Sequence, residues 1–164
     1  MPAPRSFTPY DGNHYDATES VGHQMFKLML AMRRELEARM AEHGLTDAQW
    51  KPLWILKCRT TATAIELARE IDMDAGAVTR LVDRLEAKGL VERVRSESDR
   101  RVVHLRLTAA GVKASEQVPH VLAGLNNDLL RGFTEGEWKQ LRALIARMSA
   151  NCNALQAEKE DAAS

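Results

Sequence analysis

Apolar residues in the first quarter of the chain recur every three or four positions, which is the period of an amphipathic helix. The repeat begins near Thr18, stops before Gly44, and comprises Val21, Met25, Leu28, Met29, Met32, Leu36 and Met40. His23, Phe26 and Leu30 lie on a different side of the same helix. A helix that is apolar on two sides contacts two surfaces, so we expect this one to touch its own domain and a second subunit.

Capping signals mark the start of the next three helices. Thr46 and Thr63 are each followed three positions later by a glutamine or glutamate, as in a capping box, and Asp74 is a favoured N-cap residue. They predict two short helices and then a third that Gly89 terminates. Pro52 lies past the first turn of the first of these helices, so we expect a kink or a short irregular stretch there.

After residue 90 the helical period gives way to an alternating one. Three apolar residues alternate with less apolar neighbours between positions 102 and 107, as on a half-buried strand, namely Val103, Leu105 and Leu107. Residues 90–95 are the expected partner strand. The pattern therefore predicts a β-hairpin whose turn is Ser98-Asp99-Arg100-Arg101.

Two helices follow the hairpin. Thr108 caps the first, which we expect to run to about Arg131 with kinks at Pro119 and Gly124. A capping box at residues 134 and 137, with apolar residues at 133 and 138 placed as a hydrophobic staple, starts the second. Its inner face comprises Trp138, Leu141, Leu144, Ile145, Met148, Cys152 and Leu155. Beyond Leu155 the chain becomes polar, and we expect the helix to fray.

This order of elements predicts a mainly α protein with a small β-hairpin wing, a winged helix-turn-helix with N- and C-terminal dimerisation helices. We divide it into an extended N-terminal arm (1–17), a dimerisation helix (18–45), the winged module (46–107), C-terminal dimerisation helices (108–157) and a flexible tail (158–164). The whole winged module separates the terminal helices along the chain, so they form no compact bundle alone. We therefore expect a homodimer in which a twin subunit covers their apolar faces.

Composition and charge limit the possible functions. The 164 residues are 45% hydrophobic, which suffices for a buried core in one domain with helical extensions. The 23 basic and 23 acidic residues cancel, so the overall positive charge of many nucleic-acid binders is missing. Between Arg80 and Arg106, however, eight basic residues face five acidic ones, a local net charge of +3. An ordinary solvated face would show the same excess, so charge alone does not decide.

Other features argue against a membrane protein and against an enzyme. No apolar run is long enough to span a bilayer, and the N-terminus lacks the apolar core of a signal peptide, so we expect a cytoplasmic protein. Cys58 and Cys152 are far apart and in no metal-ligand spacing, which favours buried free thiols, with redox sensing as the alternative. We find no metal-ligand cluster, phosphate-binding glycine loop or activated nucleophile, and we expect no catalytic residues, metal or cofactor.

The helix after Asp74 and the hairpin tip together resemble a DNA-reading surface. Groove entry needs small residues at the helix start, followed by long donors, and the helix offers Ala75, Gly76, Ala77, Thr79, Arg80 and Arg84. Arginine at a hairpin tip, here Arg100 and Arg101, is suited to a narrow minor groove. Asp99 is placed to hold the Arg101 guanidinium. The alternatives are an amphipathic surface helix and a turn that merely keeps the hairpin soluble.

The chain resembles the MarR (multiple antibiotic resistance regulator) family of transcription factors. The resemblance rests on Glu66-Leu67-Ala68, on residues 78–93 (VTRLVDRLEAKGLVER), and on Asp99-Arg100-Arg101 followed by residues 107–111 (LTAAG). It spans about residues 18–155 and includes the helix order. It implies an obligate homodimer on a pseudo-palindromic operator, with a recognition helix in the major groove and a wing arginine in the minor groove, the family's aspartate-x-arginine falling on Asp99 and Arg101.

The resemblance also implies a repressor that is released by a small aromatic or phenolic acid. The family places this effector around the first, second and fifth helices, where the chain offers His23, Arg33, Arg34, Trp50, Lys51 and Trp54. Aromatic walls and cations suit a carboxylate, although two tryptophans one turn apart are more often core than ligand walls, and His23 is also explained as a partnered interface residue. Two other readings stay open: a redox-responsive regulator that uses Cys58 or Cys152, and a winged-helix protein-interaction module without DNA readout.

Overall fold

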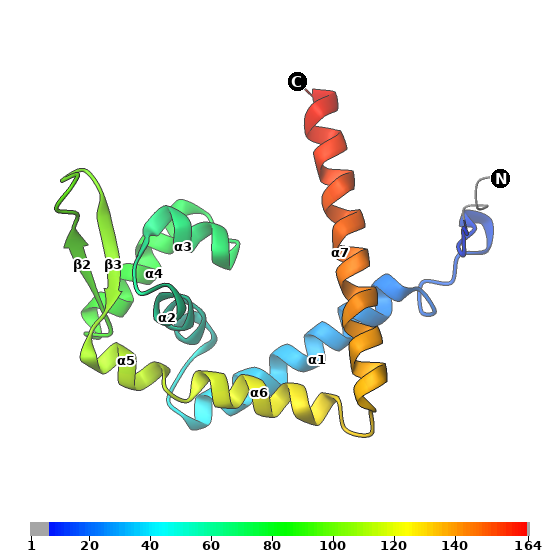
Figure 1. The fold of residues 1–164 in the computed structure, drawn as a ribbon, viewed down its shortest axis with the longest axis horizontal. Helices are drawn as coiled ribbons and strands as arrows, with labels where there is room; N and C mark the ends of the chain where they lie inside the picture. Colours follow the sequence, from blue (N-terminus) through cyan, green and yellow to red (C-terminus); the bar gives the residue numbers. More distant parts are fainter. Residues whose placement is uncertain (1–6, 164) are drawn as a thin grey trace. The chain divides into compact units, whose positions relative to one another are not determined.

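The computed structural model of the protein describes residues 7–163, and these fall into two compact units that divide after Leu122. The first unit contains a 3-10 turn (Gly12–His14), α1 (Val21–Glu42), α2 (Asp47–Arg59), β1 (Ala62–Thr63), α3 (Ala64–Ile71), α4 (Ala75–Ala87), β2 (Val91–Arg95), β3 (Val103–Leu107) and α5 (Ala109–Ser115). α6 (Val118–Leu129) crosses the division, and α7 (Glu135–Ala163) forms most of the second unit (Figure 1). The mainly helical fold with a small antiparallel sheet is confirmed.

The winged module is built around one closed apolar core. α3 packs against both α4 and α2, and the apolar sides of these helices meet the sheet, α4 against β2 and α2 and α3 against β3. The side chains at its centre are fully buried and comprise Leu53, Leu56, Leu67, Val78, Val82, Leu85, Val91 and Leu105. Burial of each of these side chains stabilises the fold by about 1.5–3 kcal/mol relative to its exposure to water. This core therefore holds α4 in place.

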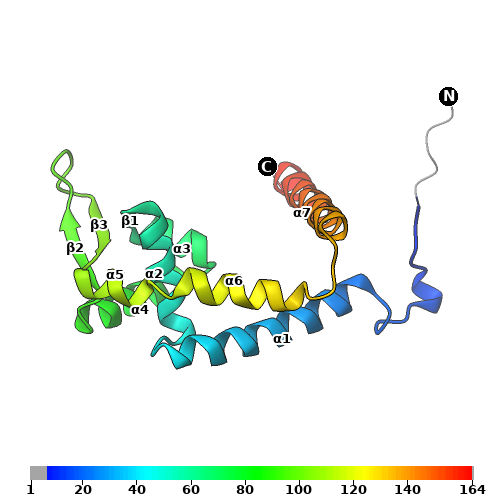
Figure 2. The same ribbon diagram turned by 60° about the horizontal axis from the view of Figure 1, so that its bottom comes forward.

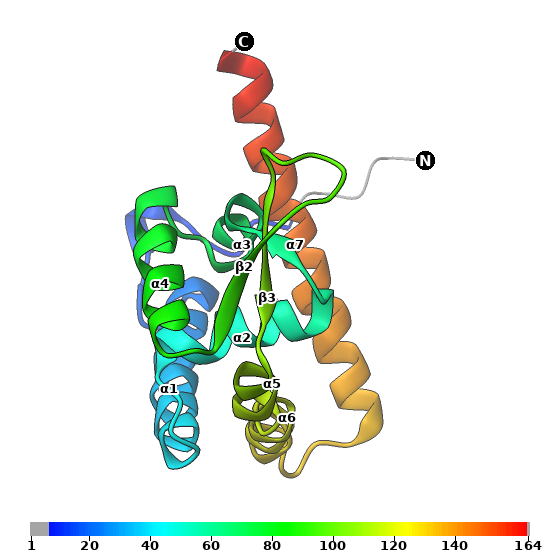
Figure 3. The same cartoon turned by 90° about the vertical axis from the view of Figure 1, so that its left-hand side faces the viewer.

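The hairpin is part of a three-stranded antiparallel sheet in the order β1-β3-β2. β2 pairs with β3 along its whole length, from Val91 opposite Leu107 to Arg95 opposite Val103. β1 adds only two residues to the other edge of β3 (Figure 2). It was not predicted from the sequence, because two residues show no alternation. The hairpin tip extends past α3 and α4, as Figure 3 shows.

The N-terminal arm is not simply extended. Residues 1–6 lie outside the described part, but Asp11 caps the short 3-10 turn through the backbone N–H of Asn13 at 3.1 Å. Tyr10 and Tyr15 pack edge to face with ring centroids 5.8 Å apart. The Tyr10 hydroxyl accepts a hydrogen bond from the Val21 N–H at 2.9 Å. The arm is therefore folded back locally onto the start of α1, which begins at Val21, three residues after the expected Thr18.

Two expected helix interruptions are corrected. α2 runs without a break through Pro52, because a proline removes one backbone N–H only and the Pro52 ring is buried in the core. The helix after Thr108 does break, but between α5 and α6, before Pro119 rather than at it. Pro119 is the second residue of α6, where its missing N–H has no intrahelical partner to lose, and Gly124 is tolerated inside α6.

Gly111 fixes how α5 joins the winged module. A Cβ atom at this position would lie 1.9 Å from the Leu90 carbonyl oxygen, so only glycine permits the close approach. The Thr108 backbone N–H donates to the same carbonyl at 3.1 Å, and its hydroxyl donates to the Gly89 carbonyl. The start of α5 is thus held against the turn between α4 and β2, and the glycine at the end of the LTAAG segment has a steric explanation.

The second unit is dominated by α7. The capping box at its start is present, since the Glu137 carboxylate accepts from the Thr134 N–H at 2.8 Å. The expected fraying after Leu155 is not seen, because α7 stays helical to Ala163 through a run of good helix formers. Its apolar face is exposed along its length, as is much of α1. None of the described helices is long and apolar enough to cross a membrane.

Candidate nucleic-acid interface

α4 presents one apolar and one polar side, and the polar side is the candidate reading face. Val78 and its apolar neighbours along the helix are buried, whereas Ala75, Gly76, Thr79, Arg80 and Arg84 are exposed and Ala77 is half-buried. The Asp74 carboxylate accepts the Ala77 N–H at 2.8 Å, which fixes the first turn. All six residues predicted from the sequence for this helix therefore lie on its N-terminal turns or its solvent side.

Gly76 leaves the backbone of the first turn of α4 uncovered. A Cβ atom there would lie 3.8 Å from Nη1 of Arg80 and 3.2 Å from the Asp74 carboxylate, so the guanidinium rests over the bare backbone. The Thr79 hydroxyl donates to the Ala75 carbonyl at 2.8 Å and keeps its lone pairs available as acceptors. The turn combines close backbone access with a long donor and an acceptor.

An ion-pair cluster that no local sequence pattern predicts joins the wing to the reading helix. Arg93 on β2 donates to Asp83 at 2.6 Å and also pairs with Glu86 on α4. The hydrogen bond with Asp83 raises the pKa of Arg93 above its ordinary value, and the charge of Glu86 adds to this. Because Asp83 and Glu86 are three positions apart on α4, one guanidinium can bridge them and fix the strand against the helix.

The hairpin tip is ordered by backbone hydrogen bonds. The Ser96 N–H donates to the Val102 carbonyl and the Val102 N–H to the Asp99 carbonyl, both at 2.9 Å. The Asp99 carboxylate accepts the backbone N–H of Arg101 at 2.9 Å, so it shapes the turn. The prediction that it holds the Arg101 guanidinium is wrong. An aspartate two residues before a donor forms such a turn with the backbone readily, and this local bond leaves the arginine side chain free to extend.

Four arginines of the reading helix and the hairpin tip are exposed and have no ion-pair partner in the described part of the chain. Arg80, Arg84, Arg100 and Arg101 are exposed and form no ion pair with any carboxylate whose side chain the structure describes. Asp83 and Glu86, by contrast, are occupied by Arg93. The four unpaired arginines are therefore the exposed cations of the reading helix and the hairpin tip, while the net charge of residues 80–106 stays at +3.

The predicted effector residues come together only in part. Arg33 contacts one oxygen of Asp47 at 2.9 Å, the Trp50 indole N–H donates to the other oxygen at 3.1 Å, and the Lys51 ammonium lies 5.9 Å from the Trp50 ring centroid. Asp47 was not predicted, although its position at the start of α2 marks it as a polar helix-end residue. Trp50 is buried, which fits its explanation as core.

The remaining effector candidates make no ion pair, hydrogen bond or cation–π contact with this cluster. His23 is ten residues before Arg33 on α1, a separation of about 15 Å along the helix. Arg34 is exposed, and Trp54 is half-buried against the core of the winged module. The structure thus joins Arg33 and Trp50 to Asp47 and Lys51 to Trp50, and places His23 well away along α1.

The expected burial of the two cysteines is wrong. Cys58 and Cys152 are both exposed free thiols. Cys58 is in the last turn of α2, beyond the part of that helix that packs in the core, and Cys152 is on the exposed apolar side of α7. The sequence pattern placed Cys152 correctly on the apolar side but did not show that nothing in the described chain covers that side.

These features define a winged helix-turn-helix protein with a cationic reading helix and wing. Comparison with known proteins narrows the class. Residues 45–103 match the family model described as "MarR family". The multiple antibiotic resistance protein MarR of Escherichia coli is 35% identical over 117 residues, which cover 70% of this chain and 81% of the relative. The chain therefore belongs to the MarR family of DNA-binding transcription regulators, whose members are not enzymes.

Solved structures agree with this assignment. A cysteine-to-serine mutant of E. coli MarR complexed with operator DNA has a TM-score of 0.71 and 29% identity, covering 82% of this chain and 99% of that one. Bordetella bronchiseptica BpsR, whose DNA binding is regulated by 6-hydroxynicotinic acid, has a TM-score of 0.71, covering 82% of this chain and 96% of its own. Its identity of 22% shows a shared fold alone.

Proposed function

We propose that the protein is a homodimeric, sequence-specific repressor that places α4 in a major groove and the hairpin tip in the neighbouring minor groove. The observation that carries this proposal is the set of exposed arginines without carboxylate partners, Arg80 and Arg84 on α4 and Arg100 and Arg101 at the tip. The Arg93 cluster supports it further, because it ties the wing to the helix so that both elements meet one duplex in a fixed geometry.

Arg101→Ala tests the wing. It should cost roughly 1–3 kcal/mol of DNA affinity, because it removes a guanidinium from the minor groove without touching the core. The duplex is one recovered by selection from a random pool, in which we expect pseudo-palindromes with half-sites about one helical turn apart. Arg147→Ala, which removes an exposed arginine on α7, is the matched control. Equal affinity of both variants would remove the wing from the interface.

The dimer is supported by uncovered apolar surface. On α1, Met25, Phe26, Leu28 and Met29 are exposed, and on α7 the whole stripe from Trp138 to Leu155 is exposed. Contiguous apolar surface of this kind marks an interaction site, and a second copy carries the same stripes. Sedimentation equilibrium measures the association directly. A monomer at micromolar concentration would contradict the proposal.

We infer an aromatic or phenolic acid as the effector, bound near the Asp47 cluster with Arg33, Trp50 and Lys51, and with His23, Arg34 and Trp54 as outer candidates. The cluster supplies cations beside an aromatic ring, which suits a planar anion. A ligand at 100 times its dissociation constant would raise stability by about 2.7 kcal/mol in a thermal-shift screen. Arg33→Ala should abolish a shift that Arg147→Ala preserves.

Two alternative functions are distinguished from a ligand-responsive repressor by DNA-binding measurements. A redox-responsive regulator should lose DNA binding on oxidation in a way that Cys58→Ser or Cys152→Ser prevents. The exposure of Cys58 makes this feasible, whereas Cys152 lies on the apolar stripe that the proposed second subunit covers. A winged-helix module that binds only protein should enrich no palindrome from a random pool of duplexes. Its main support is the balanced net charge of the chain.

A further inference from the structure

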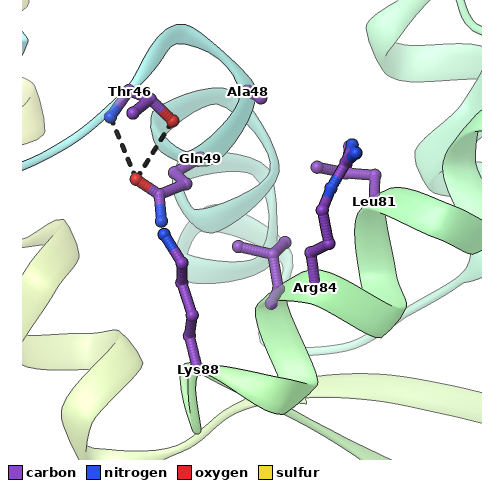
Figure 4. Close-up of a pocket in the computed structure, with 7 residues that line it drawn as sticks. Thr46, Ala48, Gln49, Leu81, Arg84 and Lys88 are labelled. Atoms are coloured by element: carbon purple, nitrogen blue, oxygen red, sulfur yellow. Dashed lines mark hydrogen bonds between the residues drawn. The ribbon is translucent and has the colours of Figure 1, made fainter.

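The pocket between the start of α2 and the C-terminal half of α4 is too small for a further ligand site (Figure 4). Its volume is about 140 Å³, whereas small-molecule sites commonly measure roughly 300–1,000 Å³. The Gln49 side-chain oxygen already accepts hydrogen bonds from the backbone N–H and the hydroxyl of Thr46, each at 3.0 Å. An uncovered surface of a different kind lies before α1, on residues 7–20, which we call the arm segment.

Local hydrogen bonds give the arm segment a defined shape. Asp11 caps the 3-10 turn, and the Asp16 carboxylate accepts both the N–H of Thr18 at 2.8 Å and its hydroxyl at 2.7 Å. The hydrogen bond between the Tyr10 hydroxyl and the Val21 N–H, 2.9 Å long, joins the segment to the first turn of α1. A segment that is preorganised in this way loses less conformational entropy when it binds a partner.

The arm segment exposes its aromatic rings. Phe7 is 86% exposed, and Tyr10 and Tyr15 are 48% and 53% exposed although their rings contact each other. Phenylalanine and tyrosine are enriched in protein–protein interfaces, where each ring buries a large area. An ordered segment with three exposed rings within nine positions therefore has the composition of a docking surface.

The charge of the arm segment argues against nucleic acid or an anionic membrane as its partner. The segment contains three carboxylates, Asp11, Asp16 and Glu19, and no lysine or arginine. These carboxylates repel the phosphate groups of DNA and of acidic lipids. The segment is also remote from the core of the winged module, because it precedes Val21, which lies about 30 Å along α1 from the buried Met40. A fitting partner therefore presents apolar surface and positive charge.

α7 carries a surface that matches the arm segment. Its exposed apolar residues are spaced alternately by three and four positions, which keeps them on one side of the helix. This α7 stripe comprises Trp138, Leu141, Ile145, Met148, Cys152 and Leu155. Residues 138–157 include three cations, Lys139, Arg142 and Arg147, and no aspartate or glutamate. Lys139 pairs with Glu135 at 2.6 Å, whereas Arg142 and Arg147 have no carboxylate partner among the described side chains.

We propose that the arm segment of one subunit docks on the α7 stripe of a second copy of the chain, with its rings against the apolar residues and its carboxylates facing the cations. Two-fold symmetry forms this contact twice in one dimer, because each subunit supplies one arm segment and one α7 stripe. The exposed apolar side of α1 begins at Val21, directly after the arm segment, so a copy that covers α1 also reaches the segment. This inference rests on the proposed homodimer and adds to its interface a part that lies before the dimerisation helix.

Phe7→Ala combined with Tyr15→Ala, the arm variant, is the sharpest test, because both rings are exposed in the single subunit and their loss leaves its core intact. The dissociation constant of the dimer, measured by sedimentation equilibrium, should rise by about tenfold or more, since two rings that the dimer buries are removed. Ile65→Ala, which removes a 64% exposed apolar side chain on α3, is the matched control and should leave the dissociation constant unchanged.

Mixed dimers test whether the arm segment crosses between subunits. The arm variant is mixed in equal amounts with Ile145→Ala, which removes one side chain from the α7 stripe. In the mixed dimer one unaltered arm segment still meets one unaltered α7 stripe, whereas neither pure dimer keeps such a contact. Native mass spectrometry at equilibrium should therefore find clearly more mixed dimers than the roughly one half that random pairing gives.

The possible results separate the arm contact from the dimer itself. If the arm variant associates as tightly as the unaltered dimer, the arm contact is wrong and the proposed homodimer stands. If the unaltered protein is monomeric at micromolar concentration, both fail. Weaker association without an excess of mixed dimers would assign the arm segment to its own subunit. A loss of duplex affinity in an arm variant that still dimerises normally would assign it to DNA, and either of these last two results overturns docking on a second copy.

Discussion

The winged module and the terminal helices are built from the same sequence signals, but they differ in what covers their apolar residues. In the module, Leu53 is 0% exposed and the surrounding apolar side chains are equally enclosed. On α1 and α7, Met29 is 66% exposed and Ile145 is 44% exposed. An amphipathic pattern therefore predicts a helix in both regions, whereas the partner that buries the apolar side is fixed by the chain only in the module.

The largest expected effect comes from removing core volume in the module. Leu53→Ala should lower the free energy of unfolding by about 2–5 kcal/mol at every protein concentration, since the cavity forms inside one subunit. Ile145→Ala on α7 should instead weaken association, so its cost should appear as a shift in the monomer–dimer equilibrium. Urea titrations at several concentrations, with sedimentation on each variant, measure both. A cost for Ile145→Ala without any effect on association would show that α7 packs within its own subunit.

Glycine substitutions sharpen the same contrast. Gly111→Ala, in the tight joint between α5 and the module, should destabilise by about 1–3 kcal/mol, because the new Cβ atom meets the Leu90 carbonyl. Gly136→Ala, in the first turn of α7, meets nothing closer than 3.9 Å and should be neutral or stabilising, since alanine favours helix. Thermal unfolding of the two variants compares them directly. Equal destabilisation would mean that α7 is packed more closely than its exposure indicates.

Local signals in the sequence proved more informative than long-range ones. The capping box at Thr63 and the helix end at Gly89 are where the pattern places them, because caps depend on residues within one turn. The two-residue strand β1 and the Arg93 cluster were missed, since both depend on contacts between distant segments. The predicted contact between the Asp99 carboxylate and the Arg101 guanidinium was wrong, because the nearby backbone N–H of Arg101 occupies the carboxylate instead.

A smaller effect is expected at a strained turn in the module. Thr60 ends α2 with φ of 65°, in a turn closed by the Thr61 N–H and the Arg59 carbonyl at 2.7 Å, whereas Gly132 takes the positive φ before α7. A β-branched residue in this region is strained by about 1–3 kcal/mol, and glycine costs about 0.5–1 kcal/mol in added freedom of the unfolded chain. Thr60→Gly should therefore stabilise by about 1 kcal/mol in urea titration. Loss of stability would show that the threonine makes a contact that outweighs its strain.

The smallest expected effect compares one capping box in each region. Hydrogen bonds from the backbone N–H and then the hydroxyl of Thr63 lower the pKa of Glu66, and Thr134 lowers the pKa of Glu137 in the same way. Because each folded-state pKa lies below its unfolded value, the contribution to stability is complete above about pH 5 and is lost as pH falls through the folded pKa. Glu66→Gln and Glu137→Gln keep an acceptor and remove the titration.

Amide hydrogen exchange near each cap, measured between neutral and acid pH, reads this loss locally. Fraying should set in at both caps of the unaltered protein over the same acid range, because the two boxes have the same geometry and both carboxylates are exposed. It should disappear separately at α3 in Glu66→Gln and at α7 in Glu137→Gln. If acid instead opens α7 in both variants, the start of α7 responds to loss of the partner subunit and not to its own cap, and the helix depends on the dimer for its first turn.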